Sequence, residues 1–272
     1  MKAVPDWLDE LHLQPGPPFH AMDTRSLRPG GWLRSRSQDA ELLVRKRELL
    51  RSNHHDVCVH DGLGAREAAD AVAHHVGMAL DRSLPPLEAA ALQTANDLCV
   101  LTRDGGRWVL TSGVVCFPSM WRLPDKIGLP VALVHGPVPA YADELATRVD
   151  RFIDRLVPGK ASWRRNWFIH DTPELFLPTP PAPHPDPEVP GGLWIRSEMQ
   201  TLARVEGAEV VLFTIRTDIA PLADVAGRPD LARQMAATIR TWSDELVEYR
   251  RAAGWRDNAI AWLERISEDA TR

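Results

Sequence analysis

Two short glycine-containing turns, each between a pair of β-rich runs, constrain the fold of this chain more than any other feature of its sequence. The first turn is Asp104-Gly105-Gly106, and the second lies around Glu206-Gly207. The runs that they join are 98–102 with 108–117, and 193–201 with 210–217. Turns of this kind between apolar runs are typical of β-hairpins, whose two strands are antiparallel. The sequence therefore predicts an antiparallel sheet.

Apolar residues at helical spacing lie on both sides of these hairpins. The predicted helices are 39–53, 62–80, 86–97, 141–157, 230–250 and a short one after Gly254. Two further strands are predicted at 131–135 and 166–170. Strands and helices do not alternate regularly, which argues against a parallel α/β fold. We therefore expect the α+β class, with an antiparallel sheet and both N-terminal and C-terminal helices packed around it.

The domain organisation follows from the distribution of proline and glycine. Residues 1–37 carry Pro and Gly clusters without a sustained period, so we expect an extended N-terminal arm. Residues 38–272 are predicted to form a single domain. Within it, residues 173–190 contain eight prolines and are predicted to form a stiff surface loop.

Charge and cysteine usage exclude several classes of partner. The formal net charge is −5 at pH 7, which argues against a general nucleic-acid binder. The chain has no run of about 18 apolar residues, so no membrane span is expected. The N-terminal residues lack the apolar core of a secretory signal. The three cysteines are too widely spaced for a disulfide framework, which favours a reducing, cytoplasmic location.

The sequence lacks the familiar P-loop, dinucleotide-binding, α/β-hydrolase and zincin motifs. The run His54-His55-Asp56-Val57-Cys58-Val59-His60 contains metal-competent residues. However, zinc sites usually draw on two separated ligand pairs, and adjacent histidines point in different directions. We therefore favour the interpretation that this run is a helix end followed by a loop.

Two other segments have both a structural and a functional interpretation. Residues 162–171 combine two Trp, two Arg and a terminal His, which suits either a clamp for a planar anionic ligand or a strand that packs its Trp into the core. Arg196 and Glu198 are two residues apart and share one face of their strand. They form either a surface ion pair or a charged pocket wall, in which Glu198 holds an ammonium substrate and Gln200 orients it.

Five segments taken together resemble the haem-binding α subunit of the haem-dependent oxidative N-demethylases. They are CFPSMWRL (116–123, followed by 126–128), HGPVPAY (135–141), WRRNWFIH (163–170), RSEMQTL (196–202) and LFTIRT (212–217). The resemblance covers roughly residues 19–249. It implies a PAS-like antiparallel sheet that holds haem b. It also implies oxidative N-demethylation of a small amine with O₂, releasing formaldehyde. Electrons are then expected from a separate reductase that carries flavin and an iron–sulfur cluster and uses NADPH.

The resemblance also directs attention to particular residues. His135 is the expected axial ligand of the haem iron, with His170 and Cys116 as alternatives. Other expected cofactor contacts are Arg122, Lys126, Arg164, Arg165 and Trp167. The expected catalytic residues are Glu198, which would bind the substrate amine, with His170 and Gln200.

The chain departs from the family pattern at a few positions. Met199 replaces an Arg, and Tyr249-Arg250 stands where Tyr-Lys is usual; these changes bear on the identity of the amine. Two alternative functions stay open: a haem-based PAS sensor or gas-binding module, and a haem-free PAS-like subunit that binds a partner.

Overall fold

The computed structural model is built around one seven-stranded sheet, with strand order β1-β5-β6-β7-β3-β4-β2 and every neighbouring pair antiparallel. It describes residues 5–16, 24–27, 31–33, 35–36, 39–134, 146–182 and 187–269. The strands are β1 Arg25–Ser26, β2 Cys58–Val59, β3 Asp97–Asp104, β4 Arg107–Val114, β5 Ala161–His170, β6 Trp194–Arg204 and β7 Val210–Pro221. The sheet and the surrounding helices confirm the predicted α+β class.

Both predicted hairpins are confirmed. Asp104 pairs with Arg107, so the first turn has two central residues, and both glycines in it have positive φ, 53° at Gly105 and 81° at Gly106. Positive φ at both positions is what a tight hairpin turn requires, and glycine adopts it without strain. The second hairpin joins β6 to β7. The strand β7 then lies beside β3, which brings the two hairpins into one sheet.

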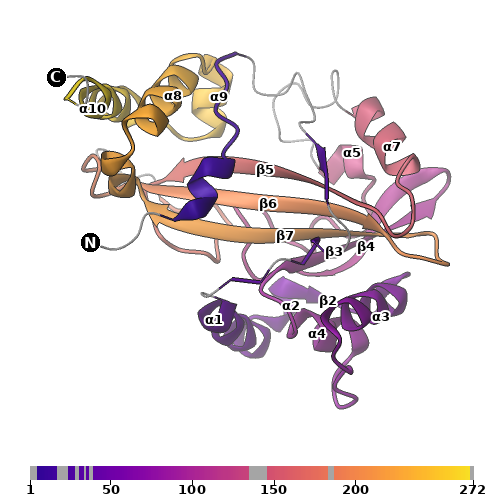
Figure 1. Cartoon of the computed structure of the whole chain (residues 1–272). Coiled ribbons are helices and arrows are strands. Elements are labelled where there is room, and N and C mark those ends of the chain that lie inside the picture. Colours follow the sequence, from indigo (N-terminus) through magenta and orange to yellow (C-terminus); the bar gives the residue numbers. More distant parts are fainter. Residues whose placement is uncertain are drawn as a thin grey trace.

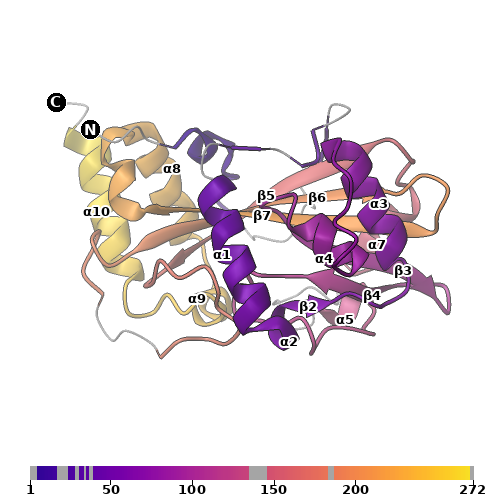
Figure 2. The same ribbon diagram turned by 90° about the horizontal axis from the view of Figure 1, so that it is seen from below.

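The helices form two layers on either side of the sheet (Figure 1). They are η1 Asp6–Glu10, α1 Asp39–Ser52, α2 His54–Val57, α3 Ala65–Val76, α4 Pro86–Ala91, α5 Val131–Val134, α7 Ala146–Asp154, η2 Leu222–Gly227, α8 Pro229–Arg240, α9 Asp244–Tyr249 and α10 Arg256–Asp269. The N-terminal helices α1 to α4 cover the lower side, as Figure 2 shows from below. The helices α5 and α7 pack against Cys99, Leu101 and Ile215 on the opposite face of the sheet. The helices α8, α9 and α10 pack against Trp167, Ile169 and Ile195, on the same face as the strand residues that α3 and α4 cover. None of the helices in the described ranges is long and apolar enough to span a membrane.

Three predicted elements were wrong in type or extent. Residues 131–134 form the helix α5, not a strand, because Leu133 and Val134 donate their backbone N–H groups to the carbonyl of Pro130. A short apolar run does not distinguish the two structures. The predicted helix 230–250 is two helices, because α8 ends at Arg240 and Ser243 is the N-cap of the separate helix α9. The predicted helix 86–97 ends at Ala91, and Asp97 already belongs to β3.

A buried lysine ties the lower helices to the sheet. Lys46 of α1 has no exposed surface, and its ammonium donates to the backbone carbonyls of Ala91, Thr94 and Asn96. The ammonium also lies 3.8 Å from the carboxylate of Asp97, which is likewise fully buried. The Lys46 ammonium therefore satisfies carbonyls at the end of α4 and in the segment after it. It also neutralises the carboxylate of Asp97, the first residue of β3.

The Asp97 carboxylate in turn fixes the segment after β4. It accepts hydrogen bonds from the backbone N–H of Cys116 at 3.0 Å and of Phe117 at 2.8 Å. The carbonyl of Phe117 accepts a 2.6 Å hydrogen bond from the guanidinium of Arg196 in β6. Lys46, Asp97 and Arg196 therefore form a chain of charges that extends from the lower helices to the middle of the sheet.

Candidate functional site

Polar and charged side chains gather on one face of strands β5, β6 and β7. Residues paired across antiparallel strands point to the same face, as do residues two apart along a strand. Glu198 pairs with Asn166 on one side and with Thr217 on the other. We call this surface the Glu198 face. Its members are Arg164, Asn166, Phe168 and His170 of β5, Arg196, Glu198 and Gln200 of β6, and Thr217 of β7.

Glu198 is a nearly buried carboxylate held between two partners. Only 8% of the residue is exposed. One carboxylate oxygen lies 3.7 Å from Nε of Arg196, and the other accepts a 3.1 Å hydrogen bond from the amide of Gln200. A carboxylate has about four acceptor positions, so these two partners leave acceptor capacity on Glu198. Glu198 and Gln200, both expected to act on the substrate, are therefore in direct contact.

Arg196 is fixed by the loops that end at the sheet. Its side chain has no exposed surface, and it donates to the carbonyls of Phe117 at 2.6 Å and Leu175 at 3.1 Å. These bonds orient the guanidinium, so its positive charge stays beside Glu198. A fixed cation allows a carboxylate to remain ionised in a buried setting, where an unpaired charge would be strongly disfavoured.

His170 ends β5 on the same face and is 5% exposed. Its Nε2 lies 3.4 Å from the hydroxyl of Ser119. Burial, reinforced by the positive charge of Arg196, lowers the pKa of His170 to about 3. The imidazole is therefore neutral at physiological pH, and one ring nitrogen keeps a lone pair that can accept a proton or bind a metal.

This depressed pKa predicts an acid-dependent loss of stability. Because the pKa of His170 in the folded protein lies below the ordinary value of 6.5, the unfolded chain is protonated first as the pH falls. The contribution of the neutral His170 side chain to the free energy of unfolding is fully present above about pH 6.5. It is lost progressively as the pH falls toward 3. At about pH 5 the loss is about 2 kcal/mol of unfolding free energy. Urea unfolding of wild type and His170→Gln, at neutral pH and near pH 5, measures it. An equal pH dependence in both proteins would contradict the assignment.

Two members of this region were not singled out as site residues from the sequence. Thr217 is 2% exposed, and among the described residues its hydroxyl has no hydrogen-bond partner. Burial raises the pKa of Tyr249 in α9, and the negative charge of Glu198 adds to that effect, so the two residues are within electrostatic reach. In the sequence, Thr217 is the last residue of the LFTIRT segment that resembles the family. Only the register of β6 with β7 shows that it lies beside Glu198.

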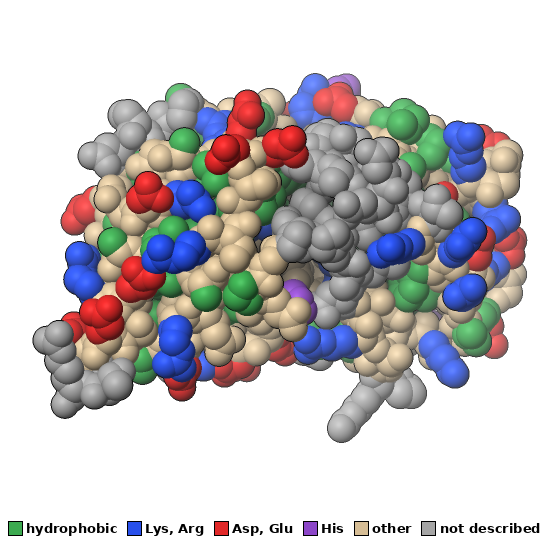
Figure 3. Space-filling model, turned by 90° about the horizontal axis from the view of Figure 1, so that it is seen from above, with side chains coloured by type: hydrophobic (Ala, Val, Ile, Leu, Met, Phe, Trp, Pro, Cys, Tyr) green, Lys and Arg blue, Asp and Glu red, His purple; other side chains and the backbone are tan. Residues whose placement is uncertain are grey.

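The upper side of the molecule is hollowed between the group formed by α8 and α10 and the group formed by α5 and α7 (Figure 3). The described ranges do not include residues 135–145. His135, the predicted axial ligand, is one of the residues outside those ranges. Its role stays a prediction, although the strand that was expected to hold it is the helix α5 up to Val134.

Arg165 and Trp167 lie on the opposite face from Glu198, because they alternate along β5 with Arg164 and Asn166. The Arg165 guanidinium forms ion pairs with Glu10 at 2.6 Å and with Asp218 at 2.9 Å. The Trp167 ring packs against Trp242, and its N–H donates to the carbonyl of His12. Of the adjacent arginines, only Arg164 shares the Glu198 face.

The remaining predicted residues lie in the segment between β4 and α5. Cys116 is buried in the core cluster formed with α1, α3 and α4, and burial raises the pKa of its thiol. Arg122 forms a 2.8 Å ion pair with Asp56, next to α2. Lys126 is half-buried in the turn that follows.

The departure from the family pattern at Met199 does not touch the Glu198 face. Met199 is paired with Arg165 and Arg216 and points to the opposite side of the sheet. This side already holds those two buried guanidinium groups. We expected this difference where a substrate or a partner could be contacted, and the strand register places it on the face opposite Glu198.

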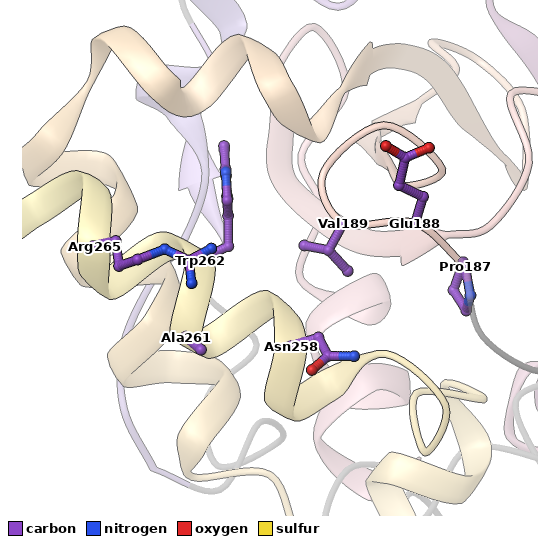
Figure 4. Close-up of a pocket in the computed structure, with 7 residues that line it drawn as sticks. All are labelled: Pro187, Glu188, Val189, Asn258, Ala261, Trp262 and Arg265. Atoms are coloured by element: carbon purple, nitrogen blue, oxygen red, sulfur yellow. The ribbon is translucent and has the colours of Figure 1, made fainter.

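A cavity of about 450 Å³ lies between α10 and residues 187–189. Trp262 and Arg265 of α10 and Val189 and Glu188 of the loop line it (Figure 4). It contains none of the predicted site residues, so it contributes nothing to the site on the sheet.

The fold and the Glu198 face together define an antiparallel α+β scaffold with a buried, charged surface on one face of its sheet. A sequence model of one family, described as "Haem-dependent oxidative N-demethylase, alpha subunit-like", matches residues 69–260. The match extends from α3 to α10 and includes every member of the Glu198 face. The chain therefore belongs to the haem-dependent oxidative N-demethylase α-subunit-like family, which confirms the resemblance found from its sequence.

Proposed function

We propose that this chain is a haem-dependent monooxygenase that oxidises a small amine, and that the reaction takes place on the Glu198 face. The observation that carries the proposal is the buried carboxylate of Glu198, which shares one face with the neutral imidazole of His170. Family membership supports the haem and the oxidative chemistry. The antiparallel sheet, with helices packed on both of its faces, supports a PAS-like core.

The residues of this face fit a bound haem in their chemistry. A neutral histidine is a common axial ligand of haem iron, and His170 is neutral. The hydroxyl of Thr217 is buried without a partner among the described residues, as expected of a surface that contacts a ligand. Arg164 supplies a guanidinium on the same face for a propionate. We therefore propose that haem b lies here, held by His135 with His170 as the alternative ligand, and with Arg122, Lys126 and Arg164 as propionate contacts.

Haem, when bound, supplies the activation of O₂ that oxidises a C–H bond next to nitrogen. The chain itself binds and orients the amine. The Glu198 carboxylate accepts N–H bonds from the ammonium form, and Gln200 holds that carboxylate in one rotamer through its 3.1 Å hydrogen bond. Phe168 and Tyr249 provide aromatic surface near the bound cation. Because Arg196 is tied to two carbonyls, its guanidinium stays 3.7 Å from Glu198 and keeps that carboxylate ionised before the substrate binds.

The electrons for this reaction are proposed to come from a separate protein. The sequence contains no dinucleotide-binding motif, and its three cysteines are buried and spread over two core clusters, so they do not form a cluster-binding set. A partner that carries flavin and an iron–sulfur cluster and oxidises NADPH would meet this need. We propose that the substrate class is a small secondary or tertiary amine and that O₂ is the oxidant.

The test is the visible spectrum of the purified protein, oxidised, reduced with dithionite and then exposed to CO. We expect a Soret band that shifts at each step, because an O₂-activating haem has an accessible coordination position. His135→Ala should abolish the band, whereas His170→Ala should retain it. The reverse pattern would assign the iron to His170. Absence of a Soret band after haem is added back would eliminate the proposal and favour the haem-free, partner-binding function.

A second experiment separates the oxygenase from a haem-based sensor. The haem-loaded protein is supplied with a reductase and a panel of methylated amines, and formaldehyde is measured against time. We expect catalytic release of formaldehyde from at least one amine. Stable CO and O₂ binding without turnover of any amine would support the sensor instead.

A further inference from the structure

Four side chains with metal-ligating atoms converge at the edge of the sheet farthest from β5. His54 is in α2, Cys58 is in β2, His60 follows β2, and Glu88 is in α4. One ligand atom from each lies within 4.8 Å of the ligand atoms of the other three. We propose that these four residues form a binding site for one zinc ion. The Glu198 face and its haem take no part in it.

The separations within the cluster are close to those of a four-coordinate ion. Sγ of Cys58 lies 3.6 Å from Nδ1 of His60, and Nε2 of His54 lies 3.0 Å from a carboxylate oxygen of Glu88. Tetrahedral zinc has Zn–S near 2.3 Å and Zn–N or Zn–O near 2.0–2.2 Å, so its ligand atoms are about 3.3–3.7 Å apart. Small side-chain rotations therefore suffice to place an ion among them.

The donor set determines the choice of ion. One thiolate and two imidazoles exclude the hard cations Ca²⁺ and Mg²⁺, which take oxygen ligands. Zinc accepts sulfur, nitrogen and carboxylate oxygen together. Four protein ligands fill a tetrahedral shell and leave no position for substrate, so the site is structural in type.

The surroundings provide both rigidity and access. Cys58 is 6% exposed in the core cluster under α3 and α4, whereas the His54 side chain is 43% exposed. A cavity of about 480 Å³ opens onto the cluster and is also lined by His55, Asp61 and Pro124. An ion can therefore enter from solvent on the His54 side and reach the buried thiol.

The site joins the β2 edge of the sheet to the helix α4. Three ligands come within seven residues, around the two-residue strand β2, and Glu88 belongs to α4. A bound zinc would tie this short edge strand to a helix of the lower layer. Residues 54–60 precede the segment matched by the family, which begins at residue 69. The match to the family model therefore does not cover these three ligands and assigns no metal site to them.

The experiment uses full-length protein purified without a polyhistidine tag. It is loaded with zinc and dialysed, and zinc per chain is measured by atomic emission; a chromophoric chelator then gives the affinity by competition. We expect one zinc per chain for wild type. His54→Ala and Glu88→Gln should weaken binding by more than the roughly 10- to 100-fold that follows loss of an outer-sphere contact. His55→Ala is the matched control, because His55 lines the same cavity and is not a ligand, and it should bind as wild type does.

Cobalt(II) provides a readout of the sulfur ligand. We expect a thiolate-to-cobalt charge-transfer band in wild type, absent in Cys58→Ser, measured as a metal-minus-apo difference spectrum. A wild-type protein that retains no zinc would overturn the proposal. So would ligand variants that bind like His55→Ala, or a charge-transfer band that persists in Cys58→Ser. His54→Ala changes a partly exposed side chain, so its folding is checked independently by circular dichroism.

Discussion

Replacing Lys46 with methionine is expected to lower the free energy of unfolding by about 3–5 kcal/mol, the range found when one partner of a buried ion pair is removed. The ammonium satisfies three carbonyls and faces Asp97 at 3.8 Å, in a position without solvent. Methionine fills similar volume but donates nothing. The variant therefore leaves three carbonyls without their donor and a buried carboxylate without its cation.

Urea unfolding followed by circular dichroism measures this effect. Arg45→Met is the matched control, because Arg45 is the adjacent residue of α1 and forms an exposed ion pair with Glu48. That variant should unfold near the wild-type midpoint. The double variant Lys46→Met with Asp97→Asn should recover part of the loss, since it removes the uncompensated charge. Equal midpoints for Lys46→Met and Arg45→Met would show that Lys46 does not support the fold.

Glu198→Gln is expected to lower kcat/KM for the amine by roughly 30- to 5000-fold, which corresponds to a loss of about 2–5 kcal/mol of transition-state stabilisation. The substitution keeps the shape of the side chain and its contact with Gln200, but it removes the negative charge that faces the ammonium. It also leaves Arg196 without its carboxylate. This expectation rests on the proposed amine oxidation.

The measurement is the rate of formaldehyde release by haem-loaded protein. Glu209→Gln is the control, because Glu209 is an exposed carboxylate paired with Arg204 at the far end of the same hairpin. Haem content is measured in each sample, so that loss of the cofactor is not mistaken for loss of substrate binding. An unchanged kcat/KM in Glu198→Gln with full haem content would remove Glu198 from the site and leave the haem assignment intact.

The hairpins were predictable because the information that specifies them is local. A two-residue turn at Gly105 and Gly106 and apolar runs on either side are visible in a short stretch of sequence. The helix α5 was not predictable in the same way. Its four apolar residues suit a strand equally well, and only the hydrogen bonds to the carbonyl of Pro130 decide between the two structures.

The candidate site was predictable within each strand but not between strands. The two-residue period already places Glu198 and Gln200 together, and it also requires Arg164 and Arg165 to point in opposite directions. The position of Thr217 beside Glu198 depends on the register of β6 with β7. Glu88 is similar, because its proximity to His54 depends on how α4 packs against α2. Contacts of this kind depend on the tertiary fold.

The position of β7 between β6 and β3 has a consequence for how the chain acquires its structure. The β3–β4 hairpin is complete at Val114, but its inner edge is filled only by residues 210–215. During synthesis one edge of the hairpin therefore stays unpaired until about a hundred further residues have been made, and an open edge is prone to pairing with other chains. Because this closing contact is so distant in sequence, we expect slow folding and a requirement for chaperones during expression.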